Sequence, residues 1–222
     1  MIDKVLKFLD DGIPKNDFDR QLLTSNLVGA TNLIELSKKE RIITLQAAKK
    51  LKLNPIKGNF DYQHLKDIHK ALFKDVYTWA GQDRNEQGIH GLFIKGNSFF
   101  CKGEYLPQEA KKIFDNLAKN NYLKNSKDLN HFAKDLANFM SDLNALHPFR
   151  EGNGRTQRIF LNELAKNAGY KLDLNLILKE KMIEASIEAM ECRNGKLEAV
   201  IKTNLKSFRQ NLDLEQNKGI SL

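Results

Sequence analysis

The chain has 222 residues, of which 41% are hydrophobic and 29% charged, a composition typical of one globular domain with a sizeable core. No apolar run reaches the roughly 18 residues that a membrane-spanning helix needs. Residues 1–11 mix charged and apolar side chains, unlike a signal peptide, so we expect a cytoplasmic protein. The only cysteines, Cys101 and Cys192, are too few and too far apart for a disulfide framework or a zinc site.

The formal net charge of +8 raises the question of nucleic-acid binding. The Lys and Arg residues are, however, spread along the chain in mixed patterns such as Lys38-Lys39-Glu40-Arg41. No basic block is interleaved with aromatic residues. The sequence therefore favours a solvated basic surface over a nucleic-acid interface, and part of that charge is available to a phosphate site.

Helical periodicity dominates the chain. It predicts helices over residues 37–53, 61–74, 107–120, 127–144, 153–168 and 178–191. In the helix that begins near residue 127, apolar side chains recur on one stripe and Ser126 is the expected N-cap. The next helix is followed by Gly169, at the position of a left-handed C-terminal cap.

Residues 88–105 interrupt the helical pattern. Gly96-Asn97 can supply the positive φ angles of a tight turn, and apolar or aromatic residues flank it on both sides. The pattern predicts a short β-hairpin within an otherwise helical protein. Because an isolated hairpin is marginal in water, we expect it to pack on the helical body or to pair with another chain.

Residues 147–158 read His-Pro-Phe-Arg-Glu-Gly-Asn-Gly-Arg-Thr-Gln-Arg and carry the groups that chemistry needs. Pro148 ends the preceding helix, because the residue before a proline avoids helical geometry, and His147 is thereby held at a helix end. The run Gly152-Asn153-Gly154 has no bulky side chain where the next helix begins. Its N–H groups and the helix dipole together predict an anion-binding cradle.

Three charged side chains complete this segment. Arg155 and Arg158 share one face of the first helical turn, where cations oppose the helix dipole unless a polyanion binds there. Glu151 adds a carboxylate that suits Mg²⁺ between phosphates. Each part alone is common in proteins that lack such a site. Together, a cradle, two arginines, a metal ligand and a general base are the parts that phosphoryl or nucleotidyl transfer requires.

The segment resembles the signature of the Fic family, His-x-Phe-x-(Asp/Glu)-Gly-Asn-Gly-Arg-x-x-Arg, with every fixed position present. The similarity extends to the stretch 54–81 before the hairpin and to residues 169–173 after the motif helix. It implies an all-α, Fic-type helical bundle with one short β-hairpin flap. It also divides the chain into an N-terminal helical extension (1–34), a Fic domain (35–205) and a C-terminal tail (206–222).

The resemblance implies a protein adenylyltransferase that moves AMP from ATP to a Ser, Thr or Tyr hydroxyl of a target protein and releases pyrophosphate. It assigns the general base to His147 and the Mg²⁺ ligand to Glu151. It assigns phosphate binding to Gly152, Asn153, Gly154, Arg155 and Arg158. The hairpin becomes a flap that pairs with the extended backbone of the target, centred on Ile94, Lys95 and Gly96. Phe93 and Phe99 either clamp the target or pack on the core.

Two alternatives stay open from the sequence. Some Fic proteins use other phosphate donors: one branch transfers phosphocholine, and a Doc-like branch phosphorylates with a motif that departs from Gly-Asn-Gly. A basic binding module with a vestigial site is the non-enzymatic alternative. The intact motif favours AMP transfer over both, without identifying the target protein or the oligomeric state.

Many Fic proteins are silenced by a helix that carries Ser/Thr-x-x-x-Glu-Gly/Asn, whose Glu pairs with the second motif arginine, here Arg158. Thr31–Glu35 fits the first five positions of this pattern, and Leu36 breaks the sixth. We therefore interpret Glu35 as an ordinary helix residue. This interpretation predicts restraint by a separate small antitoxin protein, as in a toxin–antitoxin pair.

Overall fold

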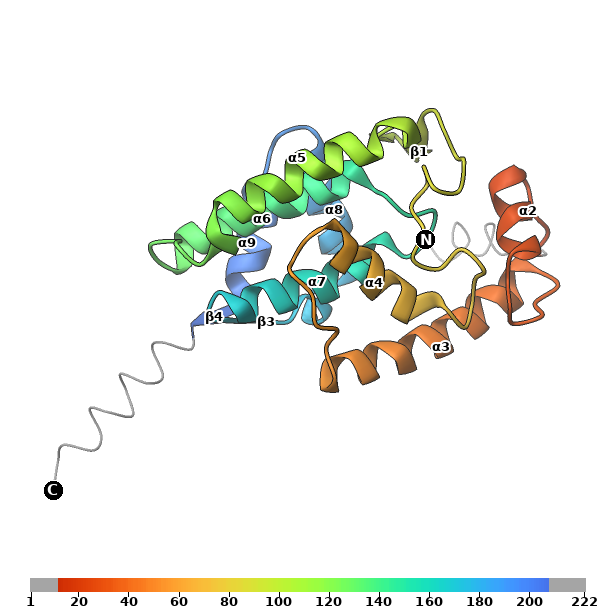
Figure 1. Ribbon diagram of the computed structural model, residues 1–222, viewed down its shortest axis with the longest axis horizontal. Coiled ribbons are helices and arrows are strands. Elements are labelled where there is room, and N and C mark those ends of the chain that lie inside the picture. Colours follow the sequence, from red (N-terminus) through yellow and green to blue (C-terminus); the bar gives the residue numbers. More distant parts are fainter. Residues whose placement is uncertain (1–11, 208–222) are drawn as a thin grey trace, which may run out of the picture. The chain divides into compact units, whose positions relative to one another are not determined.

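The computed structural model describes residues 12–207 (Figure 1). The helices are α2 (Asp17–Thr24), α3 (Leu33–Leu53), α4 (Tyr62–Phe73), α5 (Leu106–Lys119), α6 (Leu129–Leu146), α7 (Asn153–Asn167), α8 (Lys179–Met190) and α9 (Gly195–Asn204). The strands are β1 (Phe93–Lys95), β2 (Ser98–Phe100), β3 (Tyr170–Leu172) and β4 (Leu205–Ser207). Single 3₁₀ turns occur at η1 (Gly103–Tyr105), η2 (Asn121–Leu123) and η3 (Leu174–Leu176). The prediction of a helical bundle with a short β-hairpin is confirmed.

The chain forms two contact units, and the division falls within α4. One unit contains the described residues up to Ile56 together with Lys66–Gln82. The other contains Lys57–Leu65 and the described residues from Asp83 onward. Among the described helices, none is both long and apolar enough to cross a membrane.

The first unit contains α2, α3 and an aromatic cluster near Trp79. The Trp79 indole N–H donates to the Ser25 hydroxyl at 2.9 Å, and its ring stacks on Tyr77 with centroids 4.4 Å apart. Nδ1 of buried His69 accepts a hydrogen bond from the Gly81 N–H at 2.9 Å. These contacts use the polar ends of the aromatic side chains and leave their apolar faces to the core.

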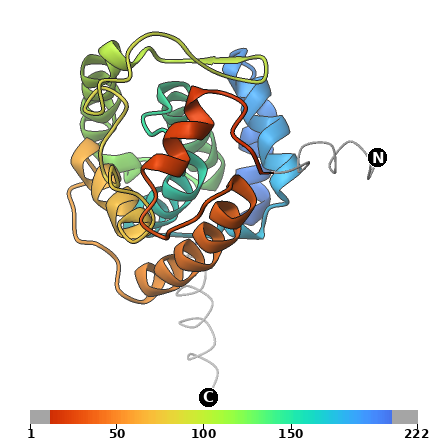
Figure 2. The same cartoon turned by 90° about the vertical axis from the view of Figure 1, so that its right-hand side faces the viewer.

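Helix α6 is the centre of the second unit, where α5, α7, α8 and α9 all contact it. Figure 2 shows α5 and the α8–α9 pair on different sides of α6 and α7. The buried face of α6 is the apolar stripe predicted from the sequence, in which Leu129 is half-buried and the other members are buried: Phe132, Leu136, Phe139, Met140 and Leu143. On α7, the fully buried Phe160 ring packs against Phe114 at 5.9 Å and Phe139 at 6.1 Å.

The predicted N-cap of α6 is wrong. Asp128 caps the helix, and its carboxylate accepts from the His131 N–H at 2.9 Å. The Ser126 hydroxyl instead donates to the Asp135 carboxylate at 2.8 Å. Ser and Asp are both favoured at an N-cap, so local preference does not separate residues two positions apart, and the tertiary contact to Asp135 decides.

The predicted hairpin is confirmed. β1 and β2 pair antiparallel around Gly96, which has φ +58°, and Ile94 lies opposite Phe99. Gly169 ends α7 with φ +88°, as expected for a left-handed cap. A second antiparallel pair, β3 with β4, is absent from the sequence prediction. The domain boundaries proposed from the sequence stay predictions, and residues 1–11 and 208–222 lie outside the described part.

Candidate active site

His147 ends α6 in a left-handed conformation, with φ +43° and ψ +60°, and its N–H donates to the Leu143 carbonyl at 3.1 Å. A non-glycine residue with positive φ is uncommon and costs about 1–3 kcal/mol. The helix stops before Pro148, as the sequence predicts. The side chain of His147 therefore lies where the chain leaves α6 for the motif loop.

The imidazole of His147 is enclosed by the hairpin. Its ring centroid lies 4.0 Å from that of Phe100 and 5.8 Å from that of Phe93. Both ring nitrogens are shielded from solvent and make no well-formed hydrogen bond with the described residues, although the backbone of Asn144 lies close enough to raise the pKa of the ring slightly. Burial lowers the pKa of His147 to about 3, and the charges of Lys95 and Arg84 act in the same direction. The ring is therefore neutral at physiological pH, with a lone pair available to accept a proton.

The motif loop is held together by the side chain of Asn153. Its Oδ1 accepts from the Phe149 N–H at 2.9 Å, and its Nδ2 donates to the Phe149 carbonyl at 2.6 Å. Both residues are buried, and Phe149 lies under the loop. Gly152 has φ +83° immediately before α7, a conformation that favours glycine. The Asn153 side chain thus supports the loop, and contact with a phosphate would come from its backbone N–H.

Glu151 places its carboxylate at the N-terminus of α7. Oε1 accepts from the Gly152 N–H at 2.9 Å and from Arg155 at 3.3 Å, and Lys95 Nζ lies 3.6 Å from Oε2. Burial raises the pKa of Glu151, but Lys95, the Gly152 N–H and Arg155 outweigh it, and the net pKa is lowered. The carboxylate is ionised and 32% exposed.

This carboxylate fits a magnesium ion shared with phosphates. Mg²⁺ commonly takes one or two protein carboxylates, and phosphates or water supply its other ligands. Among the described residues, no group of three or more His, Cys, Asp or Glu side chains could hold a metal without such help. The position of Glu151 beside the ammonium of Lys95 shows that a cation is accommodated there.

Arg155 and Arg158 lie in the first two turns of α7. Arg155 pairs with Glu151, whereas Arg158 has no carboxylate partner in the described part of the chain. Burial and the charge of Arg155 lower the pKa of Arg158. A Cβ at Gly154 would lie 3.6 Å from the Arg158 guanidinium, so this side chain folds back over the start of the helix. Two close cations at a helix N-terminus suit an anionic ligand, because the helix dipole adds positive potential at that end.

The hairpin presents two different faces. Phe93 and Phe100 face His147, and Lys95 reaches Glu151 from the same side. Ile94 and Phe99 are the cross-strand pair of the other face, with 49% and 61% of their surfaces exposed. Phe93 therefore packs on the core, whereas Phe99 is open to solvent. β1 pairs only with β2 among the described strands, which leaves its other edge open.

Sequence reasoning missed Arg84. Its fully buried guanidinium donates to the carbonyl oxygens of His147 at 3.0 Å, Leu146 at 3.3 Å and Cys101 at 2.6 Å. The residue lies far from the motif in sequence and in no periodic pattern. The one signal available is a lone cation just after the Trp79-Ala80-Gly81 run.

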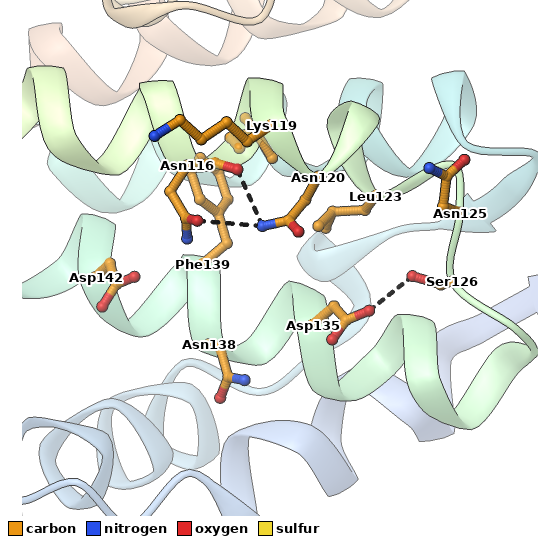
Figure 3. Close-up of a pocket in the computed structure, with 11 residues that line it drawn as sticks. Asn116, Lys119, Asn120, Leu123, Asn125, Ser126, Asp135, Asn138, Phe139 and Asp142 are labelled. Carbon is orange, nitrogen blue, oxygen red and sulfur yellow. Dashed lines mark hydrogen bonds between the residues drawn. The ribbon is translucent and has the colours of Figure 1, made fainter.

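A separate cavity of about 290 Å³ lies between α5 and α6 (Figure 3). Amide and carboxylate side chains line it, and Figure 3 shows the bonds from Asn120 to Asn116 and from Ser126 to Asp135. None of the motif side chains is among the residues that line it. This cavity is therefore not where His147 acts.

The sequence model of the Fic/DOC family matches residues 59–165, which contain the whole motif. The chain is 37% identical over 196 residues to "Protein adenylyltransferase VbhT" of Bartonella schoenbuchensis, a match that covers 88% of this chain and 40% of VbhT. It is 38% identical over 145 residues to "Probable protein adenylyltransferase y4lH" of Sinorhizobium fredii, covering 65% of this chain and 73% of that protein.

Solved structures agree with this relationship. The N-terminal Fic domain of a VirB-translocated Bep effector from Bartonella quintana, with bound ADP, has a TM-score of 0.76 and 32% identity, covering 84% of this chain and 92% of that one. BepC from Bartonella tribocorum, with bound AMPPNP, has a TM-score of 0.73 and 26% identity, covering 82% and 91%. The chain spans less than half the length of VbhT, but most of y4lH and of both structures. It belongs to the Fic/DOC family.

Proposed function

We propose that this protein is a protein adenylyltransferase, which moves AMP from ATP onto a Ser, Thr or Tyr hydroxyl of a target protein and releases pyrophosphate. The arrangement around His147 carries the proposal. A neutral, buried imidazole lies within electrostatic range of Glu151, at the helix end where Arg155 and Arg158 concentrate positive charge. The names of the curated relatives, and the nucleotides bound to the Bartonella structures, support it.

The chemical step follows from these positions. The target hydroxyl oxygen attacks the α-phosphorus of ATP, and the bond from that phosphorus to the pyrophosphate oxygen breaks. His147 takes the hydroxyl proton. Arg155, Arg158 and the N–H groups at the start of α7 neutralise and orient the phosphates. Glu151 would hold Mg²⁺ together with the phosphates, and that ion supplies further charge neutralisation when bound.

Labelled ATP tests the proposal. The purified protein is incubated with a cell extract and ATP labelled at either the α- or the γ-phosphate. We expect label on protein from the α-phosphate. Label from the γ-phosphate would indicate the phosphotransferase alternative. Absence of both labels would support a basic binding module.

The proton affinity of His147 should depend on the nucleotide. In the free protein the pKa of His147 is about 3, so the ring should not titrate between pH 5 and 8. The phosphates of bound nucleotide should raise this pKa, because negative charge favours the imidazolium. NMR titration of ¹³C-labelled histidines, with and without Mg²⁺ and AMPPNP, measures the effect, and His147→Ala identifies the signal.

The lowered pKa of His147 in the free protein also affects the stability of the fold. Between pH 3 and the ordinary histidine pKa of 6.5, the unfolded chain binds a proton at His147 that the folded chain does not. His147 therefore destabilises the fold increasingly as the pH falls below 6.5.

A free-protein midpoint near 6.5 in the NMR titration would contradict the burial of this ring.

Target docking is proposed for the open edge of the flap. In a two-residue hairpin the pair next to the turn is hydrogen-bonded, so the next pair, Ile94 with Phe99, directs its N–H groups outward. Ile94→Pro removes one outward N–H without removing a bond of the hairpin. We expect transfer to targets to fall about tenfold, the equivalent of one hydrogen bond, with little change in AMPPNP binding.

Ile94→Ala is the matched control, because it removes the side chain and keeps the N–H. It should retain more transfer than Ile94→Pro. Equal losses in the two variants would assign the contact to the side chain. A parallel loss of AMPPNP binding in the proline variant, measured by calorimetry, would indicate misfolding instead.

The proposal extends to regulation by a separate antitoxin, with the enzyme acting as a cytoplasmic toxin. At the start of α3, the Glu35 carboxylate accepts from the N–H of Thr31, which precedes the helix, at 3.0 Å and pairs with Lys39 at 2.7 Å. These contacts support the interpretation of Glu35 as an ordinary first-turn residue. We expect Glu35→Gly and the isosteric Glu35→Gln to leave the rate of transfer by the purified protein unchanged. A large rise in both would show that the chain inhibits itself and would overturn the antitoxin proposal.

A further inference from the structure

We infer that Arg84, which lies outside the signature motif, is a positioning residue for the proposed transfer reaction. It holds the backbone at His147 in place and connects it to the end of the β1–β2 hairpin. The inference rests on the proposed function and adds to it a residue 63 positions before the base. Arg84 lies in the same contact unit as the motif and the hairpin.

The first observation concerns the end of α6. The last carbonyl groups of a helix have no partner within the helix. Arg84 Nε donates to the His147 carbonyl at 3.0 Å, and Nη2 donates to the Leu146 carbonyl at 3.3 Å. A cation at a helix C-terminus is also favoured by the helix dipole. Arg84 therefore caps α6 at the residue that carries the base.

The second observation concerns the strain at His147. Its φ of +43° is unfavourable for a side chain with a Cβ, so the surrounding structure has to hold it. The backbone N–H of Arg84 donates to the Pro148 carbonyl at 2.8 Å, while its guanidinium binds the carbonyls of Leu146 and His147. One residue thus fixes the peptide groups on both sides of the left-handed position.

The third observation is that Arg84, which binds the carbonyl groups at the end of α6, also contacts the flap. Nη2 of Arg84 also donates to the carbonyl of Cys101, the residue after β2, at 2.6 Å. The Phe93 ring of β1 lies 4.6 Å from the guanidinium carbon. Cys101 in turn donates its N–H to the Ala145 carbonyl of α6 at 2.9 Å. β1 and the residue that follows β2 therefore both contact the cation that holds His147.

The burial of this cation argues against a simple packing role. The guanidinium donates to three carbonyl groups and to no carboxylate in the described part of the chain, although the charges of Asp83 and Glu104 act on it, and Nη1 has no hydrogen-bond partner there. Burying a charge in this way is costly, and burial accordingly lowers the pKa of Arg84. An apolar side chain would fill the space without that cost, but it could not bind the three carbonyls, which the fixed fork of guanidinium donors reaches at once.

The test separates positioning from folding. Arg84→Lys keeps the charge with fewer directed donors, and Arg84→Gln loses the charge. Initial rates of transfer from α-labelled ATP in a cell extract are measured against ATP concentration. We expect the maximal rate to fall about tenfold in the lysine variant and about a hundredfold in the glutamine variant, as for a small misplacement of a catalytic group. KM for ATP and the Kd of AMPPNP should change less than twofold.

A double variant shows whether Arg84 acts through the base. In a His147→Ala background, adding Arg84→Lys should cause no further loss of transfer. Phe114→Leu is the matched control for general destabilisation, because Phe114 packs in the core against Phe139 and Phe160. It should lower the melting temperature and leave the maximal rate at a permissive temperature unchanged. Independent, multiplying losses from Arg84→Lys and His147→Ala would overturn the inference.

Failure of the proposed function and failure of the positioning role would give different results. If the wild-type protein transfers no α-label, the proposed function fails; if it does and Arg84→Lys matches it, only the positioning role fails. Where an Arg84 variant loses AMPPNP binding, Arg84→Ala is assayed with methylguanidinium, which refills the vacated space. Recovery of both binding and maximal rate supports the inference, whereas recovery of binding alone overturns it.

Discussion

Replacing His147 with alanine is expected to slow AMP transfer by a factor of about 10² to 10⁴ while ATP binding is largely retained. The loss follows from removal of the proton acceptor. Binding is retained because Glu151, Arg155 and Arg158 and the N–H groups of α7 do not bond to the imidazole. Rates with α-labelled ATP and calorimetry with AMPPNP measure the two quantities separately.

His131 provides a control on the same helix. It lies at the other end of α6, its side chain is 55% exposed, and its ring bonds to Asp128. His131→Ala should transfer AMP at the wild-type rate. Wild-type transfer by His147→Ala would mean that His147 is not the base.

Asn153→Ala is expected to give the opposite pattern, in which nucleotide binding and transfer are lost together. The substitution removes both hydrogen bonds that the Asn153 side chain makes to the buried backbone of Phe149. Each hydrogen bond lost from a buried group costs about 1–3 kcal/mol, so unfolding should become easier by about 3 kcal/mol or more. For a chain of this size, the melting temperature should fall by roughly 6–12 °C. Thermal denaturation and AMPPNP calorimetry measure both effects.

Asn153→Asp should have a smaller effect on stability than Asn153→Ala. Its carboxylate can still accept from the Phe149 N–H but cannot donate to the Phe149 carbonyl, so the fall in melting temperature should be intermediate. If Asn153→Ala kept its melting temperature and lost only AMPPNP binding, the side chain would contact phosphate directly, and its role as a support of the loop would be wrong.

The fold was predictable where the signal is local. The long amphipathic helices, the Gly96-Asn97 turn and the Gly169 cap each depend on residues a few positions apart, and the structure confirms them. The β3–β4 pair was missed because it joins Tyr170–Leu172 to Leu205–Ser207. These short segments form strands only because they pair with each other. Ser126 was misassigned because its choice of partner, Asp135, is a tertiary contact.

The candidate site divides in the same way. Residues 147–158 were found from the sequence because the chemistry is concentrated in one loop and one helix end. Arg84 was not, since a buried cation that binds carbonyl groups leaves no pattern of spacing. The two hydrogen bonds of Asn153 and the depressed pKa of His147 also depend on burial, which composition does not reveal.

The left-handed backbone at His147 has a practical consequence for substrate trapping. A replacement at this position has to tolerate positive φ as well as remove the base, and alanine tolerates such angles less readily than asparagine. His147→Asn combines an inert side chain with a backbone suited to φ +43°. An affinity bait made from this variant would keep the loop poised for ATP and target, so that short-lived complexes could be isolated before any AMP is transferred.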